Sequence, residues 1–238
     1  DYSGYSVSLS SDGTTVAIGA TGNDGSGVYS GHVRIYNYNG TSWTQLGEDI
    51  NGEAGGDQSG RSVSLSSDGK TVAIGADLND GNGANSGHVR IYNYNGTAWT
   101  QLGEDIDGEA AGDNSGYSVS LSSDGKTIAI GANTNVGNGY NSGHVRIYKY
   151  IGTTWTQLGA DIDGEAASDQ SGHSVSLSSD GKTVAIGANT NNGNGSNSGH
   201  VRVYQYSADS WTQLGGDIDG EAAGDQSGYS VSLSSDGK

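Results

Sequence analysis

Apolar and polar residues alternate along short runs of this chain, and turn-forming residues separate the runs. In Tyr5–Ser10, Val7 and Leu9 share one face while serines occupy the other, as in a half-buried β-strand. The following Asp12-Gly13 pair predicts a tight hairpin turn in which both central residues have positive φ. A second alternating run, Thr15–Ala20, completes the expected hairpin.

Two more strands are expected before the pattern starts again. A loop rich in Asn and Gly leads to the third run, His32–Tyr38, and Asn39-Gly40 predicts the next hairpin turn. The fourth run is Ser42–Leu46, and an acidic link over 47–57 follows it. No segment has a useful helical period, so the pattern predicts a four-stranded antiparallel meander.

The whole pattern repeats every 56 residues, with Ser3-Gly-Tyr-Ser-Val-Ser-Leu matched by segments starting at Ser59, Ser115, Ser171 and Ser227. A period of this length is typical of propellers and solenoids. We therefore expect one repeat domain over 1–238. Its blades are expected at about 3–58, 59–114, 115–170 and 171–226, and 227–238 begin a fifth unit or form a closing strand.

The sizes of the side chains indicate how these sheets stack. Ser, Ala and Gly dominate the first two runs of each repeat, whereas Tyr and Trp are mostly confined to the third and fourth. A sheet that is narrow on one side and bulky on the other suits radial packing. We predict an all-β fold, a β-propeller-type array of four four-stranded antiparallel blades, with one extra first strand at the C-terminus. A linear stack of sheets is the alternative.

Composition and charge restrict the partners. Lys and Arg number 10 against 27 Asp and Glu, which gives a net charge of −17. A field of this sign repels nucleic acid and anionic membranes. No apolar run is long enough for a membrane span. The chain has no Cys, no initiator Met and no signal peptide, so we expect a processed piece or a segment of a longer protein.

Several short motifs recur with few changes and resemble the FG-GAP (integrin-α-like) propeller repeats of bacterial secreted and surface proteins. They are Gly4-Tyr-Ser-Val, Val16-Ala-Ile-Gly-Ala20, Gly31-His-Val-Arg-Ile-Tyr36 and Trp43-Thr-Gln-Leu-Gly47. The resemblance implies a propeller at an extracellular or cell-surface location. Repeats of this kind carry calcium on an Asp-x-Asp-x-Asp-Gly loop between the first two strands. Here that loop is only Ser-Asp-Gly-Thr/Lys, too short to wrap an ion, so these calcium sites do not transfer.

The links between repeats hold the best metal candidates. Acidic residues at positions 1, 3, 5 and 9 of a Gly-containing loop offer oxygen ligands that calcium accepts. The alternative, which we favour, is that the carboxylates cap local backbone groups. The candidate ligands are Asp105, Asp107, Glu109 and Asp113, then Asp161, Asp163, Glu165 and Asp169, then Asp217, Asp219, Glu221 and Asp225.

Other residues recur at the same period. His32, His88, His144 and His200 begin the third runs, where a strand-edge His bonded to a neighbouring loop is the favoured interpretation and a metal site the alternative. The repeated Tyr and Trp are expected in the core between blades, or else in carbohydrate pockets. N-glycosylation sequons lie at Asn39, Asn95 and Asn194, two of them in predicted turns.

The sequence offers no convincing catalytic arrangement, and only Arg61 and His173 break the repeat conspicuously. We expect a non-enzymatic structural or adhesion module that presents repeated surfaces or assembles with itself, for example into a filament. Its main partner would be another copy, reached through strand pairing. The alternative is a repeat lectin that binds glycans, with or without calcium; surface proteins are further expected partners.

Overall fold

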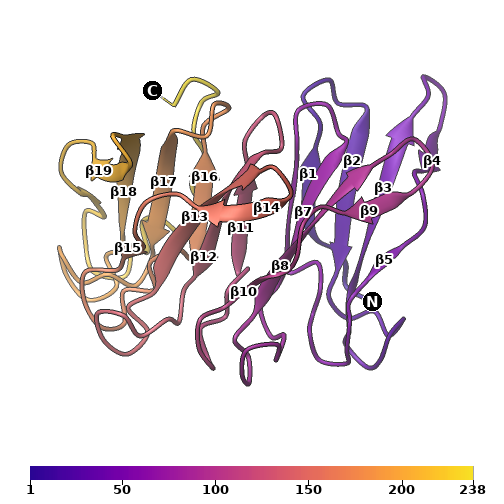
Figure 1. Cartoon of the computed structure of the whole chain (residues 1–238). Coiled ribbons are helices and arrows are strands. Elements are labelled where there is room, and N and C mark those ends of the chain that lie inside the picture. The colour runs from indigo at the N-terminus through magenta and orange to yellow at the C-terminus, as the bar shows by residue number, and fades with distance from the viewer. Residues whose placement is uncertain (238) are drawn as a thin grey trace.

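The computed structural model describes residues 1–237, and every regular element in this range is a β-strand (Figure 1). The first repeat contains β1 (Ser3–Leu9), β2 (Thr15–Ala20), β3 (His32–Tyr38), β4 (Trp43–Gln45) and β5 (Ile50–Asn51). The second contains β6 (Ser62–Leu65), β7 (Thr71–Ala76), β8 (His88–Tyr94), β9 (Trp99–Gln101) and β10 (Ile106–Asp107). The third contains β11 (Ser118–Leu121), β12 (Thr127–Ala132), β13 (His144–Ile151), β14 (Thr154–Gln157) and β15 (Ile162–Asp163). The fourth contains β16 (Ser174–Leu177), β17 (Thr183–Ala188), β18 (His200–Ser207), β19 (Ser210–Gln213) and β20 (Ile218–Asp219).

Each repeat forms one antiparallel sheet, and the predicted four-stranded meander is confirmed. In the first sheet the order is β1-β2-β3-β4. The link adds a fifth, two-residue strand that the sequence pattern did not predict: β5 pairs with β3, with Ile50 opposite Val33 and Asn51 opposite His32. The apolar Ile50 draws the start of the link back onto its own sheet, where it is buried.

The hairpin between the first two strands forms, but its turn differs from the prediction. Only Gly13 has positive φ, at 70°, whereas Asp12 does not. The Asp12 carboxylate instead accepts hydrogen bonds from Ser10 Oγ at 2.7 Å and from the Thr14 amide at 2.9 Å. The side chain thus stabilises a longer loop, which removes the need for a left-handed Asp.

Successive sheets stand side by side, and the core lies between them (Figure 1). Between the first two sheets, Val33 and Ile35 pack against Val63, Leu65 and Ile74. Two more clusters of the same make-up fill the following interfaces. The first strands of neighbouring sheets contact each other. The propeller-type arrangement with the first strand innermost is therefore confirmed.

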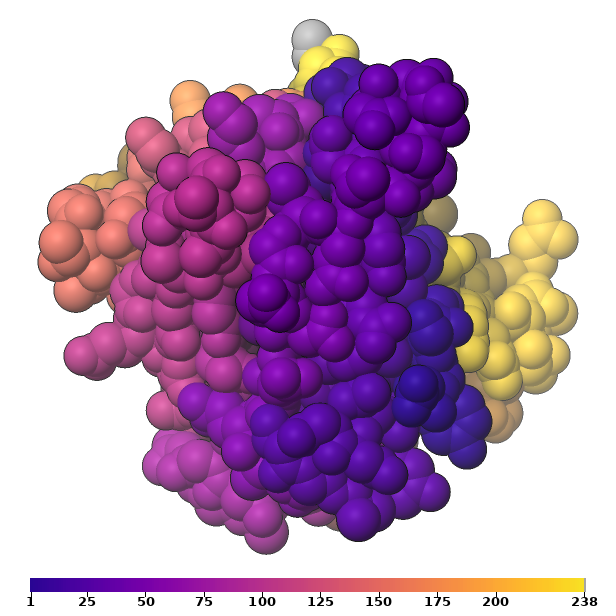
Figure 2. All heavy atoms as spheres, turned by 90° about the vertical axis from the view of Figure 1, so that its right-hand side faces the viewer, coloured from indigo at the N-terminus to yellow at the C-terminus, as the bar shows by residue number. Residues whose placement is uncertain are grey.

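Figure 2 shows the first repeat, in indigo and purple, at the front of the view with the second repeat, toward magenta, beside it. Among the described residues no sheet packs on the other face of the first sheet. Leu9 is 57% exposed, whereas its counterpart Leu65 is 8% exposed. The opposite face of the fourth sheet is also open: Ile218 is 58% exposed, against 6% for Ile50. The four sheets therefore end in two uncovered apolar faces.

The last described segment lies where the first strand of a further repeat would lie. The Leu233 amide donates to Ser176 Oγ at 2.9 Å, as the Leu65 amide donates to Ser8 Oγ at 2.9 Å. Residues 229–237 nevertheless carry no strand assignment, since no second strand pairs with them in the described range. None of residues 1–237 belongs to a helix long and apolar enough to cross a membrane.

Candidate functional site

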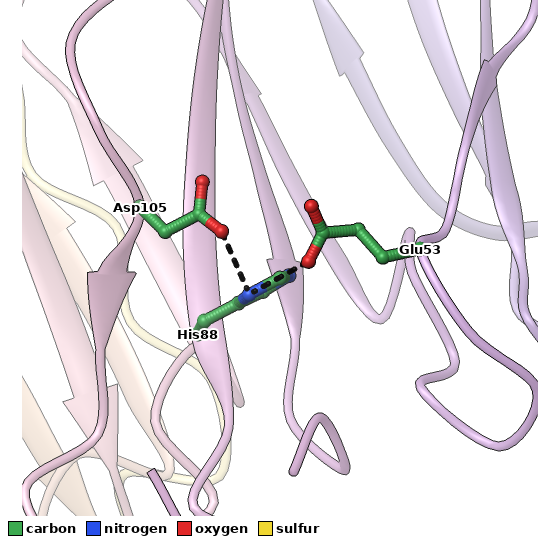
Figure 3. A group of neighbouring side chains, drawn as sticks. All are labelled: Glu53, His88 and Asp105. Atoms are coloured by element: carbon green, nitrogen blue, oxygen red, sulfur yellow. Dashed lines mark ion pairs between the residues drawn. The ribbon is translucent and has the colours of Figure 1, made fainter. Parts of the chain in front are cut away.

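A histidine and two carboxylates converge at the interface between the first two repeats (Figure 3). His88 begins β8, Asp105 lies just before β10, and Glu53 comes from the link that leaves the first repeat. The pairing of β10 with β8 returns the second link to His88, which brings Asp105 beside its ring. His88 Nδ1 is 3.6 Å from Asp105 Oδ2 and 3.9 Å from Glu53 Oε2.

The same three residue types meet at each of the next two interfaces, so the group follows the 56-residue period. In every case the Glu comes from one repeat, while the His and the Asp come from the next. The ligand-type atoms of each group lie within 4.8 Å of one another. The groups are Glu53, His88 and Asp105; Glu109, His144 and Asp161; and Glu165, His200 and Asp217.

Neighbouring side chains hold both carboxylates in place. Oε1 of Glu53 lies 3.6 Å from Arg90 Nη1, which leaves Oε2 directed at His88. Oδ1 of Asp105 accepts a hydrogen bond from Gln101 Nε2 at 2.5 Å, which leaves Oδ2 directed at the same ring. Arg90 is itself fixed by donating from Nη2 to the Asn51 carbonyl at 2.7 Å. Each carboxylate therefore has one oxygen occupied and one free to face the imidazole.

Burial sets the charge state of the group. Burial and then the nearby Arg90 lower the pKa of His88 to about 4, while Asp105 acts in the opposite direction. Burial also lowers the pKa values of His144 and His200 and raises the pKa of Glu53. At neutral pH the imidazoles are therefore uncharged and can offer a lone pair.

The first repeat has only part of this group among the described residues. His32 Nδ1 lies 3.5 Å from Asp49 Oδ2, and Arg34 Nε donates to the same oxygen at 3.2 Å. At the other end, Glu221 belongs to none of the three groups among the described residues. One incomplete half of the site thus lies at each end of the array.

The carboxylates predicted as calcium ligands within one link contact different partners in the structure. Asp105 joins His88, while Glu109 of the same link pairs with Arg146 and His144 of the next repeat. Asp113 caps its own turn by accepting from the Ala110 amide at 2.9 Å, and Asp107 belongs to no group of the described residues. The third link, with Asp161, Asp163, Glu165 and Asp169, repeats this arrangement. In the fourth, Asp217 joins His200 and Asp225 caps its turn, but Asp219 Oδ1 also lies 4.0 Å from His200 Nδ1 and Glu221 joins no group of the described residues. Calcium binding stays a prediction.

The three sequon asparagines lie at the surface. Asn39 Oδ1 accepts from the Thr41 and Ser42 amides, and Asn95 Oδ1 accepts from those of Thr97 and Ala98. Asn194 differs, because its Nδ2 donates to the Gly220 and Glu221 carbonyls. A glycan on Asn194 would require that amide to give up a hydrogen bond. Glycosylation stays a prediction for all three.

The two residues that break the repeat stack on their counterparts. The Arg61 guanidinium lies 4.9 Å from the Tyr5 ring centroid and 4.2 Å from that of Tyr117. The His173 ring lies 5.1 Å from Tyr117 and 4.8 Å from Tyr229. Residues one period apart thus form a column across the sheets. Their shared position in the repeat could have predicted this column of side chains from the sequence.

The three Glu-His-Asp groups were also missed as units, although all their residues except Glu53 had been noted separately. The signal was a fixed spacing of 35 residues from Glu53 to His88 and of 17 from His88 to Asp105, which recurs at the later groups. Using it requires knowing that consecutive sheets stack face to face, so that the link of one repeat reaches the third strand of the next.

Comparisons with known proteins support a propeller of this repeat type. The sequence model of the FG-GAP repeat matches residues 51–92, 106–148 and 160–204, which is more than half of the chain. No curated protein matches the chain significantly. Candidate 6-phosphogluconolactonases of Bacteroides uniformis and Bacteroides fragilis superpose with a TM-score of 0.60 at 15% and 16% identity. For both, the aligned region covers 90% of this chain and 54% of theirs.

A third solved structure, the periplasmic gluconolactonase PpgL of Pseudomonas aeruginosa, gives the same result. Its TM-score is 0.60 at 16% identity, over 92% of this chain and 58% of that one. The chain thus spans about half the length of the solved structures it matches. Identities this low show a shared fold and carry no activity across. On the strength of the repeat match, the chain belongs to the FG-GAP repeat family.

Proposed function

We propose that the chain is a non-enzymatic structural module, acting outside the cell, that joins copies of itself head to tail. The observation that carries this proposal is that its two uncovered end faces are the two halves of its own internal interfaces. An isolated sheet face of this kind is apolar and gains free energy when another copy of the repeat covers it. Enzymatic turnover forms no part of the proposal.

The open face of the first sheet carries the residues that, one repeat later, are packed against a neighbour. Val16, Ile18, Tyr36 and Trp43 line an open apolar hollow of about 300 Å³ there. In the second repeat, the equivalents of these side chains are packed against the first sheet. That hollow is therefore shaped for the face that a preceding repeat presents.

The open face of the fourth sheet presents the other half of an internal interface. Leu214 and Ile218 are exposed there, whereas the equivalent Ile162 is buried against the fourth sheet and Leu158 packs beside it. At each internal interface a backbone carbonyl of this face also accepts a Trp N–H: Trp99 Nε1 donates to Leu46 O at 2.7 Å. A second copy would place its Trp43 against Leu214 in the same way.

Strand exchange would complete this junction. Gly4–Gly13 and Gly228–Gly237 have the same ten-residue sequence, and both occupy the first-strand position of a repeat. Only one such segment fits between two stacked sheets. We propose that residues 228–237 of one copy pair with β2 of the next copy and displace its β1. Because the segments are identical, each displaced backbone hydrogen bond is replaced by an equivalent one.

An extracellular or cell-surface role in structure or adhesion fits the remaining features. The strongly acidic surface, with its net charge of −17, keeps individual copies soluble until they join. The FG-GAP repeats favour such a location, and the repeated outer surfaces would be the parts presented to other surface proteins. Both location and adhesion remain parts of the proposal.

A matched pair of substitutions tests the association. Ile218 is 58% exposed on the end face, whereas Ile151 is 55% exposed on an outer hairpin. Wild-type protein and Ile151→Asp are expected to form concentration-dependent polymers in sedimentation velocity. Ile218→Asp is expected to stay monomeric, because a carboxylate would be buried at the junction without a partner.

Two results would count against the proposal. One is a wild-type chain that sediments as a monomer at millimolar concentration. The other is Ile218→Asp polymerising as readily as Ile151→Asp, which would place the contact on a different surface. Circular dichroism of both variants verifies that the sheets remain folded.

Glycan binding is the second candidate function, because an aromatic and acidic pocket recurs on the outer rim. Tyr148 and Trp155 line a cavity of about 310 Å³ together with Asp105 and Asp107. The equivalent cavity in the fourth repeat, around Tyr204 and Trp211, has a volume of about 240 Å³. A small concave site with aromatic walls and a few polar groups is typical of small-ligand binding.

A glycan array probed with and without chelator tests this second function. Specific binding that Tyr148→Ala weakens would support it. Signal on no glycan under either condition would rule it out for the sugars on the array, while leaving the association test unaffected.

A further inference from the structure

We propose that each Glu-His-Asp group is a binding site for a divalent transition-metal ion of the Zn²⁺ type, held between two consecutive repeats. The three sites are Glu53, His88 and Asp105; Glu109, His144 and Asp161; and Glu165, His200 and Asp217.

The spacing of the facing atoms supports a metal ion more than a direct contact. A charge-assisted hydrogen bond between imidazole and carboxylate would bring the atoms to about 2.8 Å. Around a tetrahedral ion with bonds of about 2.1 Å, neighbouring ligand atoms lie roughly 3.4 Å apart. The Nδ1 to carboxylate distances are 3.6 and 3.9 Å at His88 and 3.8 and 3.9 Å at His200, much closer to the second value.

The buried imidazole of His200 provides an independent reason. The His200 side chain is 1% exposed, and its Nδ1 has no hydrogen-bond partner among the described residues although it faces Glu165 and Asp217. Leaving a polar atom buried and unsatisfied is costly, and native proteins rarely do so without a ligand or a function. A metal ion between the three side chains would satisfy Nδ1 directly.

The surroundings resemble the outer shell of a metal site. In each group an Arg occupies Oε1 of the Glu, and a Gln occupies Oδ1 of the Asp. The remaining oxygens, Oε2 and Oδ2, are both directed at the imidazole, as Figure 3 shows for His88. Such outer partners orient first-shell ligands and strengthen binding.

The donor set selects the class of ion. One imidazole nitrogen with two carboxylate oxygens suits Zn²⁺ and related first-row ions. Calcium instead takes about six to eight oxygen ligands and has little use for a buried nitrogen. Because the Glu side chains are about half exposed, water has access to a fourth position. This site therefore takes some of the carboxylates predicted as calcium ligands, Asp105 among them, but it differs from the calcium loops in combining residues of two repeats and in its nitrogen ligand.

The proposed ion would tie repeats together, since Glu53 belongs to one sheet and His88 to the next. A fourth site would form between copies, from Glu221 of one copy and His32 and Asp49 of the next. This fourth site rests on the head-to-tail association proposed above; the three internal sites do not.

Zinc stoichiometry tests the proposal. Chelator-stripped full chain is titrated with ZnCl₂ by calorimetry, and bound zinc is measured after gel filtration. Ile218→Asp, which we expect to be monomeric, should bind three ions per chain, and assembled wild type should approach four. In the Ile218→Asp background, Asp105→Asn should lower the count by one. The Asn side chain keeps the shape of the Asp side chain but lacks its negative charge, which weakens metal binding. Because position 105 is partly exposed, the variant is expected to fold.

A neighbouring carboxylate gives the matched control. Glu104 is exposed, precedes Asp105 in the same link and belongs to no group, so Glu104→Gln should leave the count at three. Substitution with Co²⁺ adds a direct readout, because an imidazole nitrogen on the metal changes its visible absorption. Those bands should lose about one third of their intensity in Asp105→Asn.

Three results would overturn the proposal: binding of less than one zinc ion per chain, an unchanged count in Asp105→Asn, or displacement of Zn²⁺ by equimolar Ca²⁺. A count of three in both monomer and assembled wild type would instead remove only the junction site. The association test and the zinc count therefore fail independently of each other.

Discussion

Leu65 and Leu9 occupy the same position in consecutive repeats, yet they meet different surroundings. Leu65 is 8% exposed between the first two sheets, while Leu9 is 57% exposed at the end of the array. Trp99 similarly donates its indole N–H to Leu46 O across an interface, whereas Trp43 is 47% exposed. Burial in this chain therefore comes from the neighbouring repeat, so that one sequence pattern yields either a core or an open face.

The largest expected effect sharpens that contrast directly. Leu65→Ala should lower the free energy of unfolding by about 3 kcal/mol, because it removes buried methyl groups and leaves a cavity. Leu9→Ala should cost less than about 1 kcal/mol, because the side chain is already mostly in water. Urea denaturation of the two variants measures the difference. Equal losses would mean that β1 is covered in solution.

The repeats differ at the position of Asp77, where the third and fourth repeats have Asn133 and Asn189. Asp77 is buried, and burial raises its pKa to about 6 although Arg61 Nε lies 3.4 Å from its carboxylate. The folded protein thus binds the Asp77 proton more tightly than the unfolded chain does. This proton binding stabilises the fold fully below pH 3.8, and the stabilisation is lost as the pH rises through 6. The loss should approach roughly 3 kcal/mol.

Asp77→Asn should remove that pH dependence, and Asn is the residue found at the equivalent positions 133 and 189. Free energies of unfolding between pH 3 and 8 would measure it, and the reverse change Asn133→Asp is the matched control. The third repeat has Tyr117 where the second has Arg61, so no guanidinium lies beside the carboxyl introduced at position 133. Its effect on stability should therefore depend more strongly on pH. Parallel pH curves for wild type and Asp77→Asn would contradict the interpretation.

The smallest expected effect compares the two tryptophans. Trp99→Phe removes the donor to Leu46 O and should cost about 1 kcal/mol more than Trp43→Phe, which has no sheet across from it. Differential scanning calorimetry of dilute protein would show this as a lower Tm for Trp99→Phe alone. Similar Tm shifts for both variants would indicate that the indole hydrogen bond contributes little.

Most of the fold could be predicted from the sequence because its local signals agree. Alternation in Tyr5–Ser10 and Thr15–Ala20 defines the faces, and the recurring Asp-Gly pairs mark the hairpins. The short β5 escaped prediction because a two-residue strand has no period to recognise. The turn at Asp12 was assigned the wrong geometry, since hydrogen bonds from its carboxylate support a longer loop.

The site was less predictable, for a physical reason. Glu53 and Glu109 occupy the same place in their links, and each turns toward the His of the following repeat rather than toward the carboxylates beside it in sequence. The acidic spacing within one link suggested a calcium loop, because a pattern read along one link considers only ligands from that link. Stacking between sheets decides the partners instead, and no local pattern reports it.

The central claim is that the end faces of the array are the two halves of its internal interface. Cryo-electron microscopy of the natural assembly, at a resolution that traces the chain, tests this most directly. The account predicts that Trp43 of one copy lies against Leu214 of another, with residues 228–237 of that second copy paired to β2 in place of β1. Copies joined through another surface, or a first sheet covered by a repeat of its own polypeptide, would contradict it.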